Sequence, residues 1–507
     1  MDLQKATVAF SISKSKFEQV QSRLCVSGAK PRGSTLKEMP GFHIEHFGCR
    51  AARADGEAVN GRLRAAGLAE GEPAAADVVV VNTCSVTAEA DRAARAYIRR
   101  AHRLNPQAKI VVTGCYAQRA PQELAGMDGV AAVVGNSHKA LAPQIIYDLT
   151  RTEDETASLP RALVPVASLL NGSEAATAQV WVDDRFAHSF LEEAYLGETQ
   201  LAPGAQTRPN LKIQEGCGNR CTFCVIPWTR GPSKSLPAAS VMRQVEGFAA
   251  AGGKELVLSG INLGRWGFSS GFGGETLAGL VRAILERTPL PRLRLSSIEP
   301  MDWDDELIGL LREFGGTRIA RHAHLPLQSG SDAVLRRMHR RYRPWHYAEK
   351  VEKLLGAAGP ALTLGADVMA GFPGETGREF EETLAFVRAL PFGYLHLFPF
   401  SPRPGTRAWA LHAASPVPQA AVDERLAALC ALAAEKSHTH RGRFLGRDLS
   451  AITLHTPAAL SAQGRTAALT ENFLPVELDS RLPANRLLRV RVTGLNARGA
   501  LRGHPPP

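Results

Sequence analysis

Short apolar runs alternate with helical stretches from about residue 41 onward. The first four runs predict β-strands: FHIEHF (42–47), DVVVVNT (77–83), KIVVTG (109–114) and VAAVVGN (130–136). The segments 54–67 and 88–104, which lie between such runs, have helical character. Because strands that alternate with helices form parallel sheets with crossover helices, we expect an open parallel-sheet α/β domain over residues 41–148.

The same alternation returns after residue 207. Six apolar runs predict strands near 211–215 and at 254–260, 292–299, 320–327, 362–371 and 394–400. Six β/α units over residues 208–440 predict a partial (β/α)6 barrel, smaller than the eight-unit barrel. Residues 149–207 contain Pro-, Ser- and Ala-rich pieces and lose the alternation, so we interpret them as a linker with some strand content.

The pattern changes again beyond residue 440. Segments that alternate apolar and polar residues lie at 449–456, 465–470, 473–479 and 487–495, and Gly, Pro and Asn separate them. They predict a small all-β barrel over residues 441–503. Residues 1–40 show no clear hydrophobic period and are interpreted as a disordered N-terminal extension.

The composition is that of a globular protein with an excess of positive charge. The chain has 507 residues, of which 44% are hydrophobic and 21% charged, so it can bury several cores. Its net charge is +11, a weak sign of an anionic partner such as nucleic acid. Residues 441–507 hold ten Arg, no Lys and four acidic residues, which concentrates positive charge there and favours phosphate contacts.

Several protein classes are excluded. No run of 18 or more apolar residues is present, so no transmembrane helix and no membrane partner are expected. The N-terminus lacks the apolar segment of a secretory signal, which predicts a cytoplasmic location. Eight cysteines in 507 residues are too sparse for a disulfide scaffold and should stay reduced. Metal binding, catalysis or burial remain as their roles.

Cys217, Cys221 and Cys224 form a C-x3-C-x2-C run in EGCGNRCTFC. Three thiolates on one short loop can ligate three irons of a cubane iron–sulfur cluster and leave the fourth iron open to an exogenous ligand. Gly216 and Gly218 allow the backbone to turn tightly there. The alternative is a structural zinc loop, but zinc sites more often show paired C-x2-C spacing, and this chain has no second pair.

Cys49, Cys84 and Cys115 each follow one of the first three predicted strands directly. Because the carboxyl ends of parallel strands share one edge of a sheet, these cysteines can converge although they are far apart in the chain. Burial as small apolar residues is the alternative. Their shared topological position favours a second metal site. Cys25 and Cys430 share neither pattern and are expected to be bystanders.

These motifs in combination resemble a known enzyme family. The C-x3-C-x2-C loop at the start of a partial barrel resembles the radical S-adenosylmethionine superfamily. The strand-end cysteines are similar to those of its methylthiotransferases, as are NTCSVT (82–87), TGCYAQ (113–118), HLPLQSGSD (324–332) and GFPGET (371–376). The basic terminal barrel resembles the RNA-binding TRAM module of that family. The resemblance covers residues 41 to about 500, apart from the 150–207 region.

The resemblance implies a tRNA-modifying enzyme whose cofactors are two 4Fe–4S clusters and S-adenosylmethionine. The C-x3-C-x2-C cluster would bind S-adenosylmethionine and reduce it, which releases a deoxyadenosyl radical. The cluster on the strand-end cysteines would deliver methylated sulfur to C2 of the adenine. A reducing electron donor and a sulfur source are implied as further partners. No catalytic residue is implied beyond the six cluster ligands.

Three subgroups of the family differ in substrate. NTCSVTAEADRAAR, CTFCVIPWTRG and LSGINLG resemble the enzymes that act on N6-threonylcarbamoyladenosine at position 37, in the anticodon loop of tRNA. Methylthiolation of isopentenyladenosine 37 in tRNA, or of an aspartate in a small-subunit ribosomal protein, remains an alternative. The isopentenyl enzymes usually have Gln-Asn where this chain has Ile261-Asn262. Around Cys49, FGCRAARADGE departs from the Lys-Val-Asn-Gln stretch of many relatives.

Seven residues near the carboxyl ends of the predicted barrel strands are candidate contacts for S-adenosylmethionine, because barrel active sites lie at these ends. They are Ser259, Gly260, Ser297, Glu299, Gln328, Ser329 and Asp367. Ordinary turn chemistry is the alternative for each of them.

The segment RRMHRRYRP (336–344) packs five Arg with a His and a Tyr, a mixture that suits RNA loops with unstacked bases. We therefore expect it to contact RNA together with the terminal barrel. The rival class for the whole chain is a non-catalytic iron–sulfur or zinc protein that binds nucleic acid.

Overall fold

The computed structural model describes residues 40–150, 178–184, 186, 206–268 and 274–506. Residues 40–507 form one compact unit, and Met1–Met39 form the other unit of the chain. The proposed N-terminal extension and most of the proposed linker lie outside the described residues. No helix within the described ranges has both the length and the apolar character needed to span a membrane.

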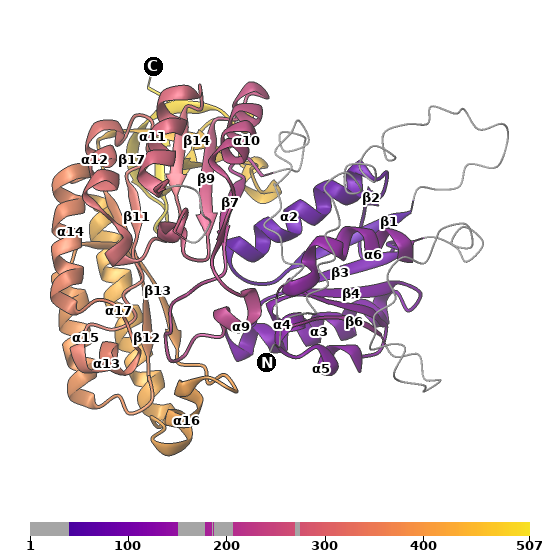
Figure 1. Ribbon diagram of the computed structural model, residues 1–507. Helices are drawn as coiled ribbons and strands as arrows, with labels where there is room; N and C mark the ends of the chain where they lie inside the picture. The colour runs from indigo at the N-terminus through magenta and orange to yellow at the C-terminus, as the bar shows by residue number, and fades with distance from the viewer. Residues whose placement is uncertain (1–39, 151–177, 185, 187–205, 269–273, 507) are drawn as a thin grey trace, which may run out of the picture. The chain divides into compact units, whose positions relative to one another are not determined.

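The first part of the chain folds into a six-stranded parallel sheet (Figure 1). Its strands lie in the order β2-β1-β3-β4-β5-β6. Their bounds are β1 Gly41–His46, β2 Ala69–Glu70, β3 Val78–Thr83, β4 Lys109–Gly114, β5 Val130–Gly135 and β6 Gln179–Trp181. β3 is buried along its whole length, as expected for a central parallel strand with helices on both faces. β6 comes from the stretch interpreted as a linker.

Helices cover both faces of this sheet, because alternate strand residues point to opposite sides. On one face Val79, Val81 and Val112 pack with α3, α4 and α5. On the other face Val78 and Val80 pack with α2 and α6. The helical bounds are α2 Arg50–Ala65, α3 Ala88–Leu104, α4 Cys115–Arg119, α5 Pro121–Ala125, the 3-10 helix η1 Asn136–Leu141 and α6 Ala142–Leu149.

The second part is a partial barrel of six parallel strands. Ladders join β9 to β7 and β10, and β12 to β11 and β13, while isolated bridges Leu293–Ile319 and Ser297–His324 connect β10 to the β11 region. The short β8 lies antiparallel at the β7 edge. The bounds are β7 Asn210–Glu215, β8 Lys234–Ser235, β9 Glu255–Gly260, β10 Arg292–Leu295, β11 His322–His324, β12 Thr363–Ala370 and β13 Phe392–Pro399.

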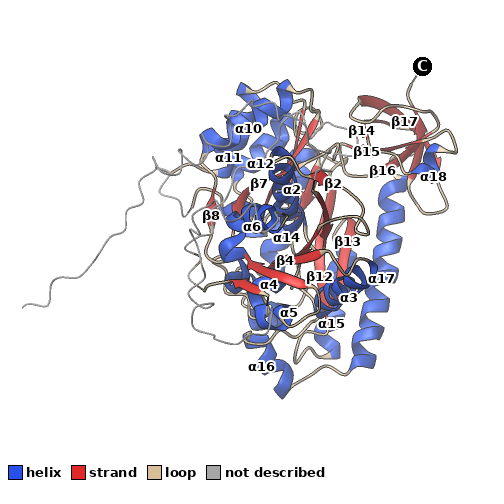
Figure 2. Ribbon diagram, turned by 90° about the vertical axis from the view of Figure 1, so that its right-hand side faces the viewer, coloured by secondary structure: helices blue, strands red, loops and turns tan. Residues whose placement is uncertain are grey.

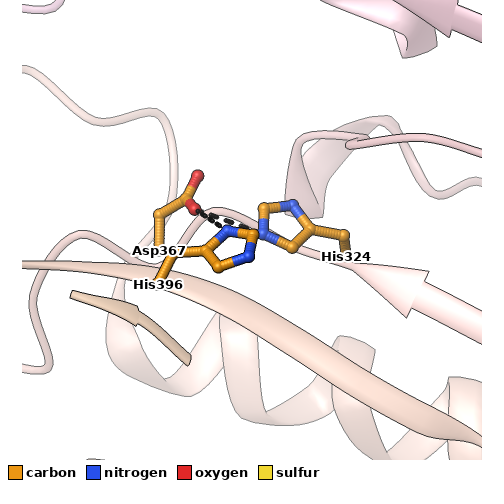
Figure 3. Close-up of side chains that lie close together, drawn as sticks. All are labelled: His324, Asp367 and His396. Carbon is orange, nitrogen blue, oxygen red and sulfur yellow. Dashed lines mark hydrogen bonds and ion pairs between the residues drawn. The ribbon is translucent and has the colours of Figure 1, made fainter. Parts of the chain in front are cut away.

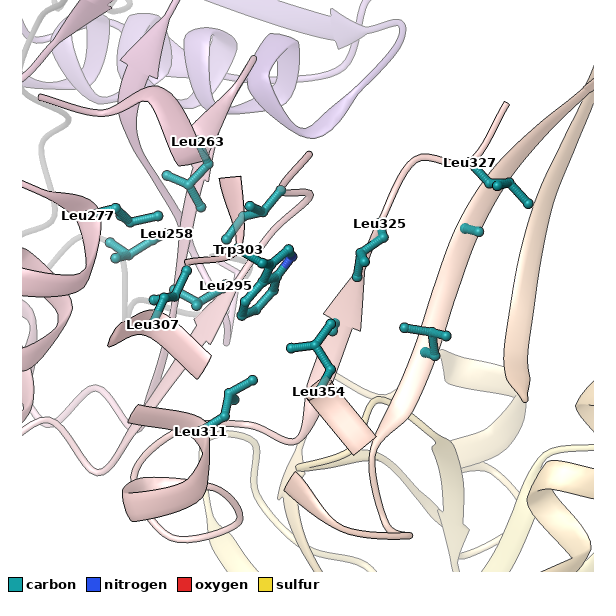
Figure 4. Packing of buried hydrophobic residues seen from close by; sticks show 14 of the residues in the cluster. Leu258, Leu263, Leu277, Leu295, Trp303, Leu307, Leu311, Leu325, Leu327 and Leu354 are labelled. Carbon is teal, nitrogen blue, oxygen red and sulfur yellow. The ribbon is translucent and has the colours of Figure 1, made fainter. Parts of the chain in front are cut away.

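Helices surround the strands of this barrel and enclose one large apolar core (Figure 4). Trp266 and Trp303 are both fully buried in it, and the indole N–H of Trp266 donates to the Leu236 carbonyl at 2.9 Å. α17 runs along β13 and leads into the C-terminal part (Figure 2). The bounds are α9 Ile226–Arg230, α10 Ala238–Ala250, η3 Leu263–Arg265, α11 Leu277–Arg287, η4 Pro300–Asp302, α12 Asp305–Phe314, α13 Asp332–Arg337, α14 Pro344–Ala358, α15 Gly377–Ala389, α16 Arg407–Ala414 and α17 Gln419–Gly442.

The last part is a closed five-stranded barrel in the order β14-β15-β16-β18-β17. Its strands are β14 Asp448–Thr453, β15 Thr466–Thr470, β16 Pro475–Leu478, β17 Leu487–Leu495 and β18 Leu501–His504, with the short helix α18 Ala458–Ser461 before β15. The β15–β16 connection contacts the partial barrel: the Glu471 carboxylate accepts from the Arg321 backbone N–H at 2.9 Å, and Asn472 donates to the Ala361 carbonyl at 3.1 Å.

The predicted fold class is confirmed: an open parallel sheet, a partial (β/α)6 barrel and a small all-β barrel follow one another along the chain. Predicted strands coincide with observed ones, and β4 has the predicted bounds of 109–114. The sequence pattern missed β18, because LRGH is short and mostly polar. It also missed β8, which has only two residues.

Candidate functional site

The strand-end cysteines lie at one edge of the N-terminal sheet. Cys49 precedes α2, Cys84 follows β3 directly, and Cys115 opens α4 after β4. The three preceding strands, β1, β3 and β4, are neighbours. A Cβ added at Gly48, whose φ is +110°, would lie 2.8 Å from the Cys84 sulfur. The loop that carries Cys49 therefore packs directly against Cys84.

The effect of two neighbouring thiols on the pKa of Cys84 also indicates that the three cysteines lie close together. Burial, and then the neighbouring Cys115 and Cys49, raise the pKa of Cys84 to about 12. Cys84 and Cys115 are buried, whereas Cys49 is exposed. Thiols in such a group ionise when a cation arrives, because metal binding displaces their protons.

The second set of cysteines lies on the loop after β7. The Cys224 N–H donates to the Cys221 carbonyl at 3.1 Å, and the Cys217 N–H donates to the Gly231 carbonyl at 3.2 Å, so the loop is tightly folded. A Cβ at Gly216 would lie 2.0 Å from the Pro232 carbonyl oxygen, which explains why a residue without a side chain stands there. Burial, and then Cys221 and Cys217, raise the pKa of Cys224 to about 12.

N–H groups point at the sulfurs of this loop. The backbone N–H of Asn219 donates to Cys217 at 3.4 Å and that of Ile226 donates to Cys224 at 3.4 Å. Arg340 donates from Nη1 to Cys221 at 3.3 Å. Such donors stabilise thiolates and tune metal–sulfur centres.

The spacing of the sulfurs separates two kinds of metal site. A tetrahedral zinc ion holds its sulfurs at about 2.3 Å, which places them about 3.8 Å from one another. Within the described ranges, neither set of cysteines brings all three sulfurs within 4.8 Å of one another. A cubane cluster spreads its cysteines over different irons and so needs wider spacing.

A buried arginine links the N-terminal sheet to the partial barrel. Arg230, from the CTFCVIPWTRG motif, donates from Nε to the Cys115 sulfur at 3.3 Å and from Nη1 to Asp55 at 3.0 Å and to Glu215. Asn136 donates to the Thr229 carbonyl at 2.7 Å and to the Cys115 sulfur at 3.5 Å. Glu215 lies just before the loop that carries Cys217. The Arg230 side chain therefore joins the Glu215 carboxylate to Cys115 of the strand-end set.

Arg230 belongs to a buried network of three cations and two carboxylates. Lys139 contacts Asp55 at 3.1 Å and Glu215 at 3.0 Å, and Lys212 contacts the same two carboxylates. Burial alone would raise the pKa of Glu215, but Lys139, Lys212 and Arg230 hold it well below its usual value. The network joins α2 and η1 to β7 and α9. It was not found from the sequence, because its members are far apart there.

Some candidate contacts for S-adenosylmethionine have free polar atoms. The Ser259 hydroxyl and the Gln328 side-chain carbonyl oxygen are buried and have no hydrogen-bond partner among the described residues. Gln328 also has a positive φ of 67°. Gly260 ends β9, where the Gln214 side chain lies close to it. Buried polar groups without partners are rare, so these atoms are available for a ligand.

The other candidates already have protein partners. Glu299 pairs with Arg340, and Ser329 forms a hydrogen bond with Thr383 at 2.9 Å. Ser297 lies 3.0 Å from the Nδ1 of His324. The sequence therefore grouped residues that play different local roles.

Asp367 lies inside the partial barrel between two histidines (Figure 3). Its Oδ1 is 3.2 Å from His324 Nε2 and 3.1 Å from His396 Nδ1. Burial would raise the pKa of Asp367, but hydrogen bonds from His324 and His396 hold it below its usual value. The side-chain exposure rises from 8% at His324 to 58% at His396, so this group is open to solvent on one side.

The RRMHRRYRP segment, which we expect to contact RNA, also makes contacts within the protein. Tyr342 is buried, and its hydroxyl donates to the Pro326 carbonyl at 2.7 Å. All five arginines of the segment form ion pairs within the protein: Arg336 and Arg343 with Asp332, Arg337 with Glu379, Arg340 with Glu299 and Arg341 with Asp302. The segment holds the barrel together and supplies a donor to Cys221.

Two known families match the chain. Residues 41–135 match the "Uncharacterized protein family UPF0004", and residues 211–387 match the "Radical SAM superfamily". The first range contains the strand-end cysteines, and the second contains the C-x3-C-x2-C run.

Characterised relatives extend the match over most of the chain. "Threonylcarbamoyladenosine tRNA methylthiotransferase MtaB" of Aquifex aeolicus (strain VF5) is 33% identical over 82% of this chain and 91% of its own length. The protein of that name from Bacillus subtilis (strain 168) is 34% identical over 86% of this chain and 89% of its own length. "tRNA-2-methylthio-N(6)-dimethylallyladenosine synthase" of Cereibacter sphaeroides (strain ATCC 17025 / ATH 2.4.3) is 33% identical over 82% of this chain and 88% of its own length.

Proposed function

Because the chain belongs to the methylthiotransferase family of radical S-adenosylmethionine enzymes, we propose that it converts N6-threonylcarbamoyladenosine at position 37 of tRNA into its 2-methylthio derivative. The single observation that carries this proposal is the pair of cysteine sets, one at a sheet edge and one on the first barrel loop. Arg230 joins Cys115 of the first set to Glu215, which lies just before the second set. Two metal centres with separate roles suit an enzyme that both generates a radical and transfers sulfur.

As a radical S-adenosylmethionine enzyme, the chain uses S-adenosylmethionine and a 4Fe–4S cluster, which supply, when bound, the one-electron chemistry at C2 of the adenine. Cys217, Cys221 and Cys224 would hold this cluster. Asn219, Ile226 and Arg340 orient and stabilise their thiolates through N–H donors.

Cys49, Cys84 and Cys115 would hold a second 4Fe–4S cluster. Arg230 from α9 and Asn136 from η1 would stabilise the Cys115 thiolate. The free polar atoms of Ser259 and Gln328 would bind S-adenosylmethionine at the carboxyl ends of the barrel strands. Gly260, Ser297, Glu299, Ser329 and Asp367 would line the same region.

The reaction further requires a reducing electron donor and a source of sulfur. The C-terminal barrel would bind tRNA through its exposed arginines, because phosphate contacts dominate the affinity of proteins for nucleic acids. The exposed arginines there include Arg481, Arg486 and Arg498.

A second candidate is methylthiolation of dimethylallyladenosine in tRNA, since a relative named for that activity is also 33% identical. Nucleoside mass spectrometry separates the two. The full chain, reconstituted with iron and sulfide under anaerobic conditions, is given tRNA that carries either threonylcarbamoyladenosine or dimethylallyladenosine at position 37. We expect a 2-methylthio product from the first tRNA. A product from the second tRNA alone would replace the proposal by its alternative, and a deletion strain with unchanged 2-methylthio-threonylcarbamoyladenosine would refute it.

A further inference from the structure

Four arginines lie close to the contact between the partial barrel and the C-terminal barrel: Arg208 just before β7, Arg292 and Arg294 on β10, and Arg50 at the start of α2. Three of them surround the ring of Phe473, which comes from the C-terminal barrel: the guanidinium carbons of Arg50, Arg294 and Arg208 lie 5.4, 5.3 and 6.0 Å from the ring centre. The fourth, Arg292, lies two residues from Arg294 on β10. Phe473 itself has a positive φ of 68°, so the loop places this ring among the arginines at a conformational cost.

These arginines outnumber the carboxylates that pair with them. Arg208, Arg292 and Arg294 all pair with one carboxylate, that of Glu255, at 2.7, 3.2 and 2.8 Å. Arg294 is fully buried, and its Nη1 has no hydrogen-bond partner among the described residues. Buried cations in excess over their partners are costly, and such sites are stabilised by an anionic ligand.

Arg50 is the cation that remains free. Among the described residues its guanidinium has no hydrogen bond or ion pair, and its ring contact with Phe473 leaves its N–H donors unused. The ring of Phe473, over which Arg50 lies, is 5.6 Å from that of Tyr394, and the Tyr394 ring is 6.0 Å from His324 and 5.2 Å from His396, so Arg50 lies near the His324–Asp367–His396 group. Asp367 itself is already engaged by the two histidines.

The position of Arg50 in the chain connects this free cation to the reaction. Arg50 directly follows Cys49, and Arg50 is the first residue of α2. The residue that would hold the anion is therefore the neighbour in the chain of Cys49, one of the cysteines to which we assign sulfur delivery. In the adenine ring, C2 and C6 both flank N1, so a substituent on N6 lies close to the carbon that receives sulfur.

We propose that Arg50 binds the carboxylate of the threonylcarbamoyl group and thereby selects the substrate. Arg208 and Arg294, which lie around the same Phe473 ring, add positive electrostatic potential. This inference rests on the proposed function. A dimethylallyl group is apolar and uncharged and would leave the Arg50 guanidinium without a partner. A site rejects a substrate more strongly by leaving its own polar group unpaired than by a small difference in apolar contact. A carboxylate accepts two parallel N–H bonds from a guanidinium, a geometry that neither an amide nor an alkyl group reproduces.

The test compares three synthetic anticodon stem–loops that differ only at position 37. One carries threonylcarbamoyladenosine, one carries the same group with its carboxylate converted to a carboxamide, and one carries unmodified adenosine. Dissociation constants are measured by fluorescence anisotropy on the reconstituted full chain, together with the 2-methylthio product by mass spectrometry. The variants are Arg50→Gln and Arg50→Lys. Arg53→Gln, an exposed arginine one turn later on α2 that pairs with Glu57 at 3.3 Å, is the matched control.

We expect the wild-type chain and Arg53→Gln to prefer the carboxylate over the carboxamide stem–loop by about 10- to 100-fold. In Arg50→Gln this ratio should fall to about one, and Arg50→Lys should keep part of it. The ratio is taken within one preparation, so it is independent of any loss of cluster, which iron content reports separately.

Four results would overturn the proposal. An unchanged ratio in Arg50→Gln shows that another residue reads the carboxylate. An equal weakening of all three stem–loops shows that Arg50 contacts a backbone phosphate. A wild-type chain that methylthiolates the threonylcarbamoyl stem–loop without preferring its carboxylate refutes the role of Arg50 alone, whereas a wild-type chain that produces no such product refutes the proposed function as well.

Discussion

The Nε of Arg230 lies 3.3 Å from the sulfur of Cys115, a residue 115 positions earlier in the chain. Arg340 has the corresponding relationship with Cys221, at 3.3 Å from Nη1. Each set of cysteines thus receives one N–H bond from a buried arginine, and each arginine also pairs with a carboxylate. The two proposed metal centres would therefore lie in similar electrostatic surroundings.

Replacing Arg230 should alter the second cluster selectively. In Arg230→Lys the positive charge stays but the N–H···S bond to Cys115 is lost, so the reduced, more negative state of that cluster loses stabilisation. We expect its reduction potential to fall by roughly tens of millivolts. Electron paramagnetic resonance during a redox titration measures this, in chains whose other cysteine set is replaced by alanine. Arg340→Lys should instead shift the C-x3-C-x2-C cluster, and equal shifts of both clusters by either variant would contradict the assignment.

The two sets of cysteines should separate in function. Cys217→Ala is expected to lower iron by about four atoms per chain and to abolish deoxyadenosine formation from S-adenosylmethionine. Cys84→Ala should lower iron by about the same amount, keep deoxyadenosine formation and stop sulfur insertion. Iron analysis and chromatography of the nucleosides give both readouts. Cys430→Ala, on the exposed side of α17, is the matched control and should behave as the wild type. Loss of deoxyadenosine in Cys84→Ala would contradict this division.

Removing the shared carboxylate of Glu255 should destabilise the fold. Glu255→Gln leaves Arg208, Arg292 and Arg294 buried without a counter-charge, which is expected to lower the free energy of unfolding by about 3–5 kcal/mol. Anaerobic urea denaturation measures it. Glu286→Gln breaks an exposed pair with Arg282 on α11 and should leave the unfolding free energy unchanged within error. A similar result for the two variants would show that Glu255 is not the partner on which the arginines depend.

Acid should destabilise the contact between α17 and β12 through His440. Burial, and then Arg443 and Arg441, lower the pKa of His440 from 6.5 to about 4. The unfolded chain therefore takes up a proton at a pH where the folded chain does not, so stability is lost as the pH falls from about 6.5 towards about 4. The expected loss is about 2 kcal/mol between about pH 7 and about pH 5, measured by urea denaturation.

His440→Asn should reduce that pH dependence, because the amide does not titrate and can still form a hydrogen bond with Thr363, whose hydroxyl lies 2.8 Å from Nε2 of His440. The exposed His438 on the same helix provides the control substitution. If His440→Asn kept the full slope between those pH values, another group would be responsible.

The sequence predicted the features that depend on repeating patterns. Runs such as DVVVVNT predict central strands, and parallel topology then places Cys84 and its two counterparts at one edge without any distance information. It could not predict Arg230, Arg340 or Arg50 as partners of the site, because long side chains reach residues more than a hundred positions away and no pattern reports such contacts.

The ion pairs of RRMHRRYRP could not be predicted for the same reason, and its contact with RNA remains a prediction. A run of arginines indicates charge but not where the charge is compensated, and here Arg337, Arg340 and Arg341 pair with carboxylates on other elements. The roles assigned to Ser259 and Gln328 remain predictions. The Ser259 hydroxyl and the Gln328 side-chain oxygen can be identified as buried and unpaired only from the folded structure.

The C-terminal barrel should determine how RNA binding depends on salt. Arg481, Arg486 and Arg498 are exposed, and their side chains have no ion pair among the described residues, whereas Arg489 and Arg491 pair with Asp448. Free guanidinium groups that contact phosphates release counterions, so each contact adds about 0.7–0.9 to the slope of log affinity against log salt. Replacing the three free arginines by Gln should reduce the slope by about 2–3, as measured by anisotropy of a tRNA stem–loop over a range of salt concentrations.

The matched control for this variant replaces three exposed arginines on helices of the partial barrel by Gln: Arg287, Arg312 and Arg378. Both triple variants lose the same net charge, so a general electrostatic attraction would change both slopes equally. Contacts made by the C-terminal barrel change only the first. If the two slopes fell by the same amount, the barrel would contribute charge without contacting RNA, and the tRNA would have to be held by another surface.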